Sequence, residues 1–176
     1  MLVLLLYFVL SIKQQVNSVE STCFYHLRRL KQIKRYIITD AVKHLVAAVI
    51  IGRLDYCNSV LAGLQWSTIA PLQRVQNAAA RLVLGLSPCD YDSSVRHSFE
   101  LHWLPIHYRI QFKLALLMYM AHIGQSAAYI IDAVTPVNQE PSRSRLRYGA
   151  TTDFIIPRTR TKIGETLFSV FGWNSL

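Results

Sequence analysis

Apolar residues recur at steps of three and four positions along most of this chain, from Val16 to Ala121. That spacing gathers them on one side of an α-helix, because each helical residue turns by about 100°. The stretches that follow the pattern are residues 16–37, 41–64, 68–84, 105–121 and 127–134. Gly85, directly after the third stretch, is a typical helix end. The sequence therefore predicts a mainly α fold, a helical bundle of four to five helices.

The character of the chain changes after Pro136, where polar, Arg-rich and Thr-rich residues replace the apolar stripes. Short β-like pieces at residues 145–148 and 154–156 predict a small Arg-rich β-like C-terminal tail. Three parts follow from this reading: an apolar run at residues 1–12, a helical domain at residues 13–135 and a basic tail at residues 136–176.

Positive charge gathers in two short segments of the chain, whose formal net charge is +9. Residues 26–35 hold five basic and no acidic side chains, and residues 141–162 hold six basic side chains against Asp153. Such clusters favour a polyanionic partner, with an ordinary solvated surface as the alternative. Phosphate contacts of this kind give affinity without sequence choice. The predicted nucleic-acid-binding residues are Arg28, Arg29, Lys31, Lys34, Arg35, Arg143, Arg145, Arg147, Arg158, Arg160 and Lys162.

Patterns for catalysis or metal binding are weak. None of the ten acidic residues adjoins another, whereas a polymerase needs paired carboxylates to clamp two metal ions. Structural zinc sites usually contain closely spaced cysteines, which argues against a site drawn from Cys89, His97, His102 and His107. The glycines are isolated, so no phosphate-cradling loop is present. The sequence predicts no enzyme activity, no metal and no cofactor.

Three ordered strings carry a family resemblance: Leu-Asp-Tyr-Cys-Asn at residues 54–58, Leu-Gln-Arg-Val-Gln-Asn-Ala-Ala-Ala-Arg at 72–81, and Leu-His-Trp-Leu-Pro at 101–105 followed by Arg109. In this order they resemble the region downstream of the polymerase palm in reverse transcriptases of non-long-terminal-repeat retrotransposons, of the jockey-like and chicken-repeat-like kind. We expect the motif residues to tie helices together rather than to catalyse a reaction. These structural residues are Arg53, Asp55, Asn58, Asn77, Arg81, Trp103, Pro105 and Arg109.

The resemblance implies a thumb-like domain that grips a template–primer duplex. The expected function is that of a non-catalytic fragment of an RNA-directed DNA polymerase, retaining at most non-specific RNA or DNA binding. Its expected partners are an RNA or DNA duplex and the upstream polymerase domain of the parent element, if that is encoded. In the family, residues 1–12 would correspond to a buried palm-side strand, or they are an accidental start that replaces it.

Two alternatives stay open from the sequence. The apolar run at residues 1–12 could act as a signal-like segment of a secreted or membrane-surface helical protein. The run lacks a basic start and small residues at a cleavage site, and it is shorter than the ~20 residues that span a bilayer. A nuclear or cytoplasmic location is therefore preferred to secretion, and a membrane partner is not preferred. The other alternative is a remnant with no selected function.

Overall fold

The computed structural model describes residues 2–56, 58–86 and 101–133, with side chains over 11–56, 58–86 and 101–132. The chain forms two compact units, Met1–Ile110 and Gln111–Leu176. Across the described ranges the regular structure is helical and no strand occurs, which confirms the mainly α prediction. The expected β-like tail at residues 136–176 lies outside these ranges, as does the expected boundary between residues 135 and 136.

Helix α1 (Leu2–Ile33) begins far earlier than the first apolar stripe and continues without a break through residue 12. The expectation of a strand at residues 1–12 is therefore wrong. The run is rich in leucine, a strong helix former, and contains neither glycine nor proline to stop the helix. The predicted stripe is confirmed further along, because Val16, Cys23, Leu27 and Leu30 are all buried. A 3₁₀ turn, η1 (Lys34–Tyr36), ends the helix.

The second helical segment is broken into pieces, contrary to the continuous helix expected over residues 41–64. It consists of α2 (Thr39–Val46), a π-helical turn η2 (Ala47–Ile51), α3 (Gly52–Asp55) and a 3₁₀ turn η3 (Asn58–Leu61). Tyr56, the C-cap of α3, is extended, with ψ of 124°. Gly52 disfavours a regular helix here, and Asn58 bonds to the side chain of Asp55 across the break.

The π-helical turn also shifts the buried stripe of this segment. A π turn holds more residues than an α turn, so the residues that follow it face a different direction. Ile50 and Leu54 are buried, as are Val42 and Val46 before the turn. Val60 also belongs to the apolar stripe expected over residues 41–64, but it is 49% exposed. The apolar pattern thus located Val42 and Val46 correctly, but it was wrong for Leu45 in α2, which is 37% exposed, and for Val60 beyond the π-helical turn.

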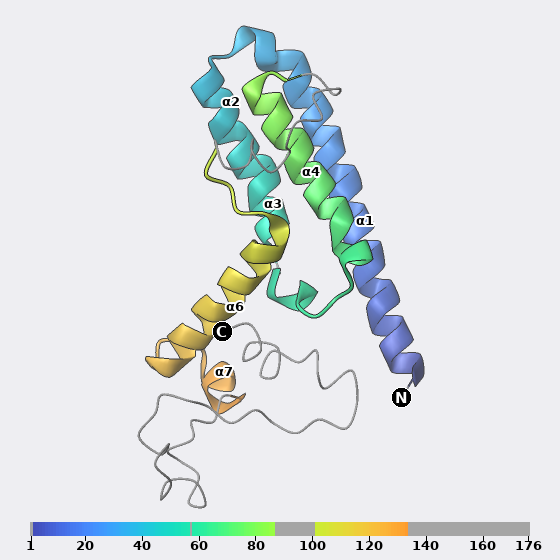
Figure 1. Cartoon of the computed structure of the whole chain (residues 1–176), viewed down its shortest axis with the longest axis vertical. Helices are drawn as coiled ribbons and strands as arrows, with labels where there is room; N and C mark the ends of the chain where they lie inside the picture. The colour runs from blue at the N-terminus through green and yellow to red at the C-terminus, as the bar shows by residue number, and fades with distance from the viewer. Residues whose placement is uncertain (1, 57, 87–100, 134–176) are drawn as a thin grey trace, which may run out of the picture. The chain divides into compact units, whose positions relative to one another are not determined.

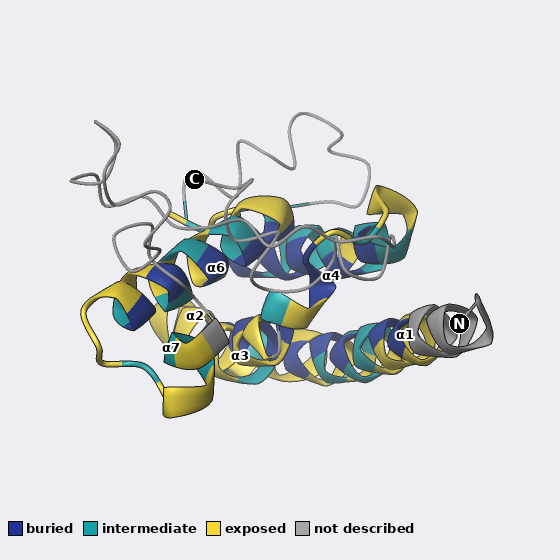
Figure 2. Cartoon of the chain, turned by 90° about the horizontal axis from the view of Figure 1, so that it is seen from below, coloured by how far each residue is buried: buried dark blue, intermediate teal, exposed yellow. Residues whose placement is uncertain are grey.

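Helix α4 (Trp66–Leu84) confirms the prediction for residues 68–84. Gly85 follows it in the left-handed conformation, with φ of 75°, and the N–H of Gly85 donates to the Arg81 carbonyl. Within the first unit α4 packs along α1, and both also contact α2 (Figure 1). The buried faces of α1 and α4 form much of the core (Figure 2).

Two further helices match their predicted ranges within one residue at each end. Helix α6 (Ile106–His122) follows Pro105, and α7 (Ala128–Ala133) is short. In the first unit the N-terminal turn of α6 buries Ile106 and Ile110. No helix among the described residues has both the length and the hydropathy that crossing a membrane requires.

Ala79 provides a test of the packing of α4, because it is completely buried. We expect Ala79→Leu to lower the free energy of unfolding by about 1–3 kcal/mol, since the added carbons must displace close-packed neighbours. Ala48→Leu, at an exposed position, should change it by less than about 0.5 kcal/mol. Urea denaturation followed by circular dichroism measures both. Equal effects at the two sites would contradict the packing described here.

Candidate nucleic-acid interface

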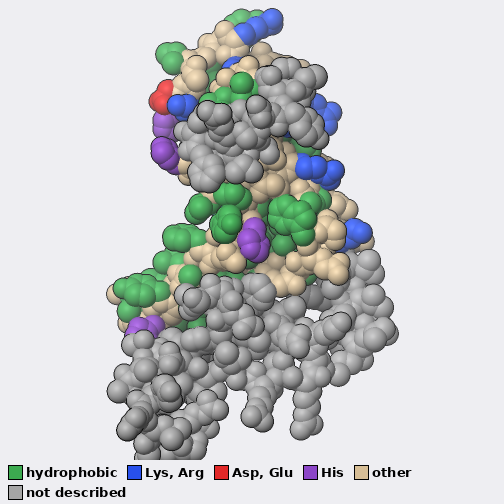
Figure 3. Space-filling model, viewed as in Figure 1, with side chains coloured by type: hydrophobic (Ala, Val, Ile, Leu, Met, Phe, Trp, Pro, Cys, Tyr) green, Lys and Arg blue, Asp and Glu red, His purple; other side chains and the backbone are tan. Residues whose placement is uncertain are grey.

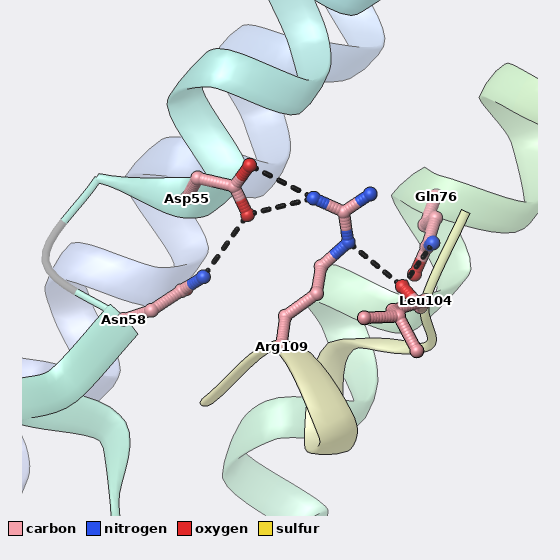
Figure 4. Close-up of polar contacts among 5 residues, drawn as sticks. All are labelled: Asp55, Asn58, Gln76, Leu104 and Arg109. Carbon is pink, nitrogen blue, oxygen red and sulfur yellow. Dashed lines mark hydrogen bonds and ion pairs between the residues drawn. The ribbon is translucent and has the colours of Figure 1, made fainter. Parts of the chain in front are cut away.

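A polar network centred on Arg109 joins three segments of the first unit (Figure 4). The Nη1 of Arg109 donates to both carboxylate oxygens of Asp55, each at 2.8 Å. Its Nε donates to the Leu104 carbonyl at 2.7 Å. The Nδ2 of Asn58 donates to Asp55 Oδ1 at 3.1 Å. One guanidinium therefore links the end of α3 to the connection before α6.

Two glutamines of α4 hold the same connection from the other side. The Nε2 of Gln76 donates to the Leu104 carbonyl at 2.8 Å, so this carbonyl accepts two hydrogen bonds (Figure 4). The Oε1 of Gln73 accepts a hydrogen bond from the N–H of Ile106 at 2.9 Å. That N–H is the first of α6 and would otherwise lack an intrahelical partner. Gln73 thus caps a helix that is distant from it in sequence.

The structure brings together some of the predicted motif residues. Asp55, Asn58 and Arg109 meet directly, and Pro105 accepts a hydrogen bond from the N–H of Arg109 at 3.0 Å. Asn77 is linked through its Oδ1, which accepts from the Nε2 of Gln73 at 2.9 Å. Trp103 is half-buried and lines a shallow hollow together with Asp40 and His44 of α2.

Gln76 was missed as a site residue, although its signal was present in the sequence. It lies among the apolar positions of the third stripe, between Leu72 and Ala80, and it is completely buried. A polar side chain on such a face needs a hydrogen-bond partner. Its amide nitrogen has the Leu104 carbonyl, whereas its Oε1 has no partner within the described protein.

Arg53 is a motif residue that lies outside the network. It was expected to join a polar network, but its side chain is exposed and Arg109 fulfils that role. Arg53 lies close enough to Cys23 to influence it electrostatically. Burial raises the pKa of the Cys23 thiol, and the positive charge of Arg53 offsets part of that rise. Cys23 is accordingly a neutral core residue.

The first predicted basic segment, residues 26–35, lies at the C-terminal end of α1 and in η1. Arg28, Arg29, Lys31 and Arg35 are exposed, and Lys and Arg side chains gather along the α1 side of the view in Figure 3. The guanidinium of Arg35 lies 4.7 Å from the centre of the Tyr36 ring. All four positions are therefore accessible to a partner in the described structure.

Lys34 and Arg81 extend this basic region onto α4. The Nζ of Lys34 donates to the Leu82 carbonyl at 2.6 Å, close to the end of α4. A cation at this point complements the partial negative charge of a helix C-terminus. Arg81, which the motif suggested as structural, lies with Arg28, Lys31 and Lys34 around a hollow of about 340 Å³ between α1 and α4.

None of these six cations forms an ion pair with a carboxylate among the described residues. The ion pairs within those ranges are Arg109–Asp55, Arg74–Glu20 and His44–Asp40. We define the basic end as the set of Arg28, Arg29, Lys31, Lys34, Arg35 and Arg81. Its positive charge is not neutralised within the described part of the protein, which suits a phosphate partner.

Other predicted positions fall outside the described residues. These are Arg143, Arg145, Arg147, Arg158, Arg160 and Lys162 in the second basic segment, together with Cys89 and His97 of the rejected zinc site. Within the described ranges no three His, Cys, Asp or Glu side chains are grouped so that they could hold a metal ion.

Comparison with known proteins identifies no relative of this chain. No protein-family model, no curated protein and no solved structure matches it. The function of the basic end must therefore be argued from its own residues and geometry.

A double-mutant cycle tests the Arg109–Asp55 pair. We expect Asp55→Ala and Arg109→Ala to show a coupling free energy of about 1 kcal/mol in urea denaturation, because the two side chains belong to one network. The coupling free energy should be no larger because solvent screens the Asp55 side chain, which is 44% exposed, against 14% for Arg109.

The pair of Arg74 and Glu20 is the matched control, with an N–O distance of 3.1 Å and side chains that are 67% and 20% exposed. Its coupling should be about 0.5 kcal/mol or less. If the coupling free energy of Arg109–Asp55 is no larger than that of Arg74–Glu20, the network does not stabilise the fold more than an ordinary surface ion pair does.

Proposed function

We propose that this chain derives from the post-palm region of a non-long-terminal-repeat retrotransposon reverse transcriptase and binds nucleic-acid duplexes without sequence choice. It acts as a non-catalytic module in the nucleus or cytoplasm, with the polymerase domain of a parent element as its second partner. The observation that carries the binding proposal is the basic end. Four of its cations, Arg28, Lys31, Lys34 and Arg81, line one hollow between α1 and α4, and Arg29 and Arg35 are exposed on α1 and η1. None of the six has a carboxylate partner among the described residues.

The arrangement of these cations supports duplex binding. Arg28 and Lys31 are one helical turn apart, so both extend from the same side of α1. Their long side chains can reach successive phosphates as the backbone of a duplex passes, and each contact releases condensed counterions. Contacts to phosphates carry no sequence information directly. We therefore expect similar affinity for all mixed sequences.

The polar network supports the proposal indirectly. It involves Asp55, Asn58, Gln73, Gln76 and Arg109, and it fixes the connection before α6 against α3 and α4. These residues belong to the strings that carry the family resemblance. By holding α4 and the connection before α6 in place, they support the helix that carries Arg81, the one residue of these strings that belongs to the basic end.

Salt dependence tests the proposed function. The triple variant Arg28→Gln, Lys31→Gln and Arg35→Gln should bind a mixed-sequence duplex more weakly at all salt concentrations between about 50 and 200 mM. Each lost phosphate contact reduces the log–log salt slope by about 0.9, so the slope should become about three units less steep. Fluorescence anisotropy with a labelled duplex measures both quantities.

The control removes the same number of charges from scattered positions. Lys13, Lys43 and Lys113 are exposed lysines on α1, α2 and α6, and their triple change to Gln should leave the slope within about one unit of wild type. If both triple variants lost the same duplex affinity and salt slope, the overall net charge rather than the basic end would explain the binding. Binding that does not depend on salt would contradict phosphate recognition.

A further inference from the structure

The hollow between α1 and α4 combines two kinds of lining. One part is cationic and consists of Arg28, Lys31, Lys34 and Arg81. The other part is apolar and is formed by Phe24, Leu27, Ala78, Leu82 and Leu86, with Gly85 beside them. None of the described residues that line it is acidic. A ligand that fits must therefore carry negative charge at one end and an apolar surface at the other.

Part of the cationic lining is fixed by the fold. The Leu82 carbonyl holds the Nζ of Lys34 at 2.6 Å. Gly85 leaves space for this ammonium, because a Cβ at residue 85 would approach the Nζ to 3.3 Å. Gly85 also needs its positive φ to end α4. One cation of the hollow is thus positioned before any ligand arrives.

The apolar lining makes the hollow more than an anion site. Phe24 and Leu82 are half-buried, so each keeps some surface that a ligand can cover. Aromatic side chains provide stacking surface for any nucleobase. The volume of about 340 Å³ is at the lower end of the range for small-molecule pockets, roughly 300–1,000 Å³. A single nucleotide is a ligand of this size and dual character.

We propose that the hollow between α1 and α4 binds one unpaired nucleotide of a nucleic-acid strand, with its base against the Phe24 side and its phosphate among Arg28, Lys31 and Arg81. The inference rests on the proposed nucleic-acid function and adds a ligand class to it. A base inside a duplex is stacked and paired, so its face is not free. The basic end would thus bind duplex phosphates along its outer cations and hold a single-stranded nucleotide in the hollow.

Adenosine monophosphate is a suitable probe of the hollow. Its binding to the full chain can be followed by isothermal titration calorimetry, with adenosine and ribose 5-phosphate as the two half-ligands. Because both parts of the hollow contribute, we expect the complete nucleotide to bind at least about tenfold more tightly than either half. Equal affinity for ribose 5-phosphate would show an anion site only and would overturn the proposal.

The variant Ala78→Leu tests the space in the hollow separately from its positive charge. Ala78 lines the hollow, so a larger side chain fills the space while all four cations remain. We expect this variant to lose nucleotide binding at least about tenfold, while its duplex affinity and salt slope stay close to wild type. Unchanged nucleotide binding in Ala78→Leu would overturn the proposal. The melting temperature of the variant shows whether it folds.

A second pair of variants serves if Ala78→Leu does not fold. Lys31→Gln removes a cation of the hollow, whereas Arg29→Gln removes an exposed cation of the same helix that does not line it. Nucleotide binding should weaken in Lys31→Gln and not in Arg29→Gln. Equal effects of the two variants would show that general charge attracts the nucleotide, and the proposal would fail.

The outcomes also separate this inference from the proposed function. Duplex binding without nucleotide binding would leave the proposed function standing and overturn the hollow site. Nucleotide binding without duplex binding would support the hollow site and contradict the duplex proposal. Binding to phosphatidylserine vesicles that adenosine monophosphate does not displace, and that Ala78→Leu abolishes, would assign the hollow to anionic lipid instead.

Discussion

The Leu104 carbonyl is the point on which the arrangement of the first unit depends. It accepts hydrogen bonds from both Arg109 and Gln76, while Arg109 also holds Asp55. A carbonyl at the end of an irregular connection would otherwise lack the partners that helix interiors supply. Because Gln73 caps Ile106 nearby, the connection is fixed to α4 on both sides of Pro105. The helices around it are thereby held without a metal ion or disulfide among the described residues.

Helical periodicity predicted the long elements well, since a stripe of apolar residues depends only on local geometry. The ranges of α4 and α6 followed from it within one or two residues at each end. It failed at the π-helical turn. One wider turn changes the direction in which all later side chains of the segment point, and the spacing of apolar residues does not reveal such a turn. It also failed at residues 1–12, where an apolar run without breakers supports a helix as readily as a strand.

The candidate site was predictable in part. The exposed cations of α1 followed from their spacing, and the motif strings indicated residues that link helices. The partner of Asp55 did not follow, because Arg53 is near in sequence whereas Arg109 is near only in space. Likewise, the meeting of Arg81 with the cations of α1 depends on how α4 packs against α1. Contacts between residues that are distant in sequence depend on tertiary packing, and the local patterns of a single sequence do not predict them.

Lysine footprinting tests most directly whether the basic end is the surface that meets nucleic acid. The protein is acetylated at low salt with and without a saturating mixed-sequence duplex, and each lysine is quantified by mass spectrometry. The account predicts that the duplex slows acetylation of Lys31, while the exposed Lys13, Lys43 and Lys113 react at unchanged rates. Protection of Lys13 or Lys43 with Lys31 left reactive would place the interface elsewhere and contradict the account.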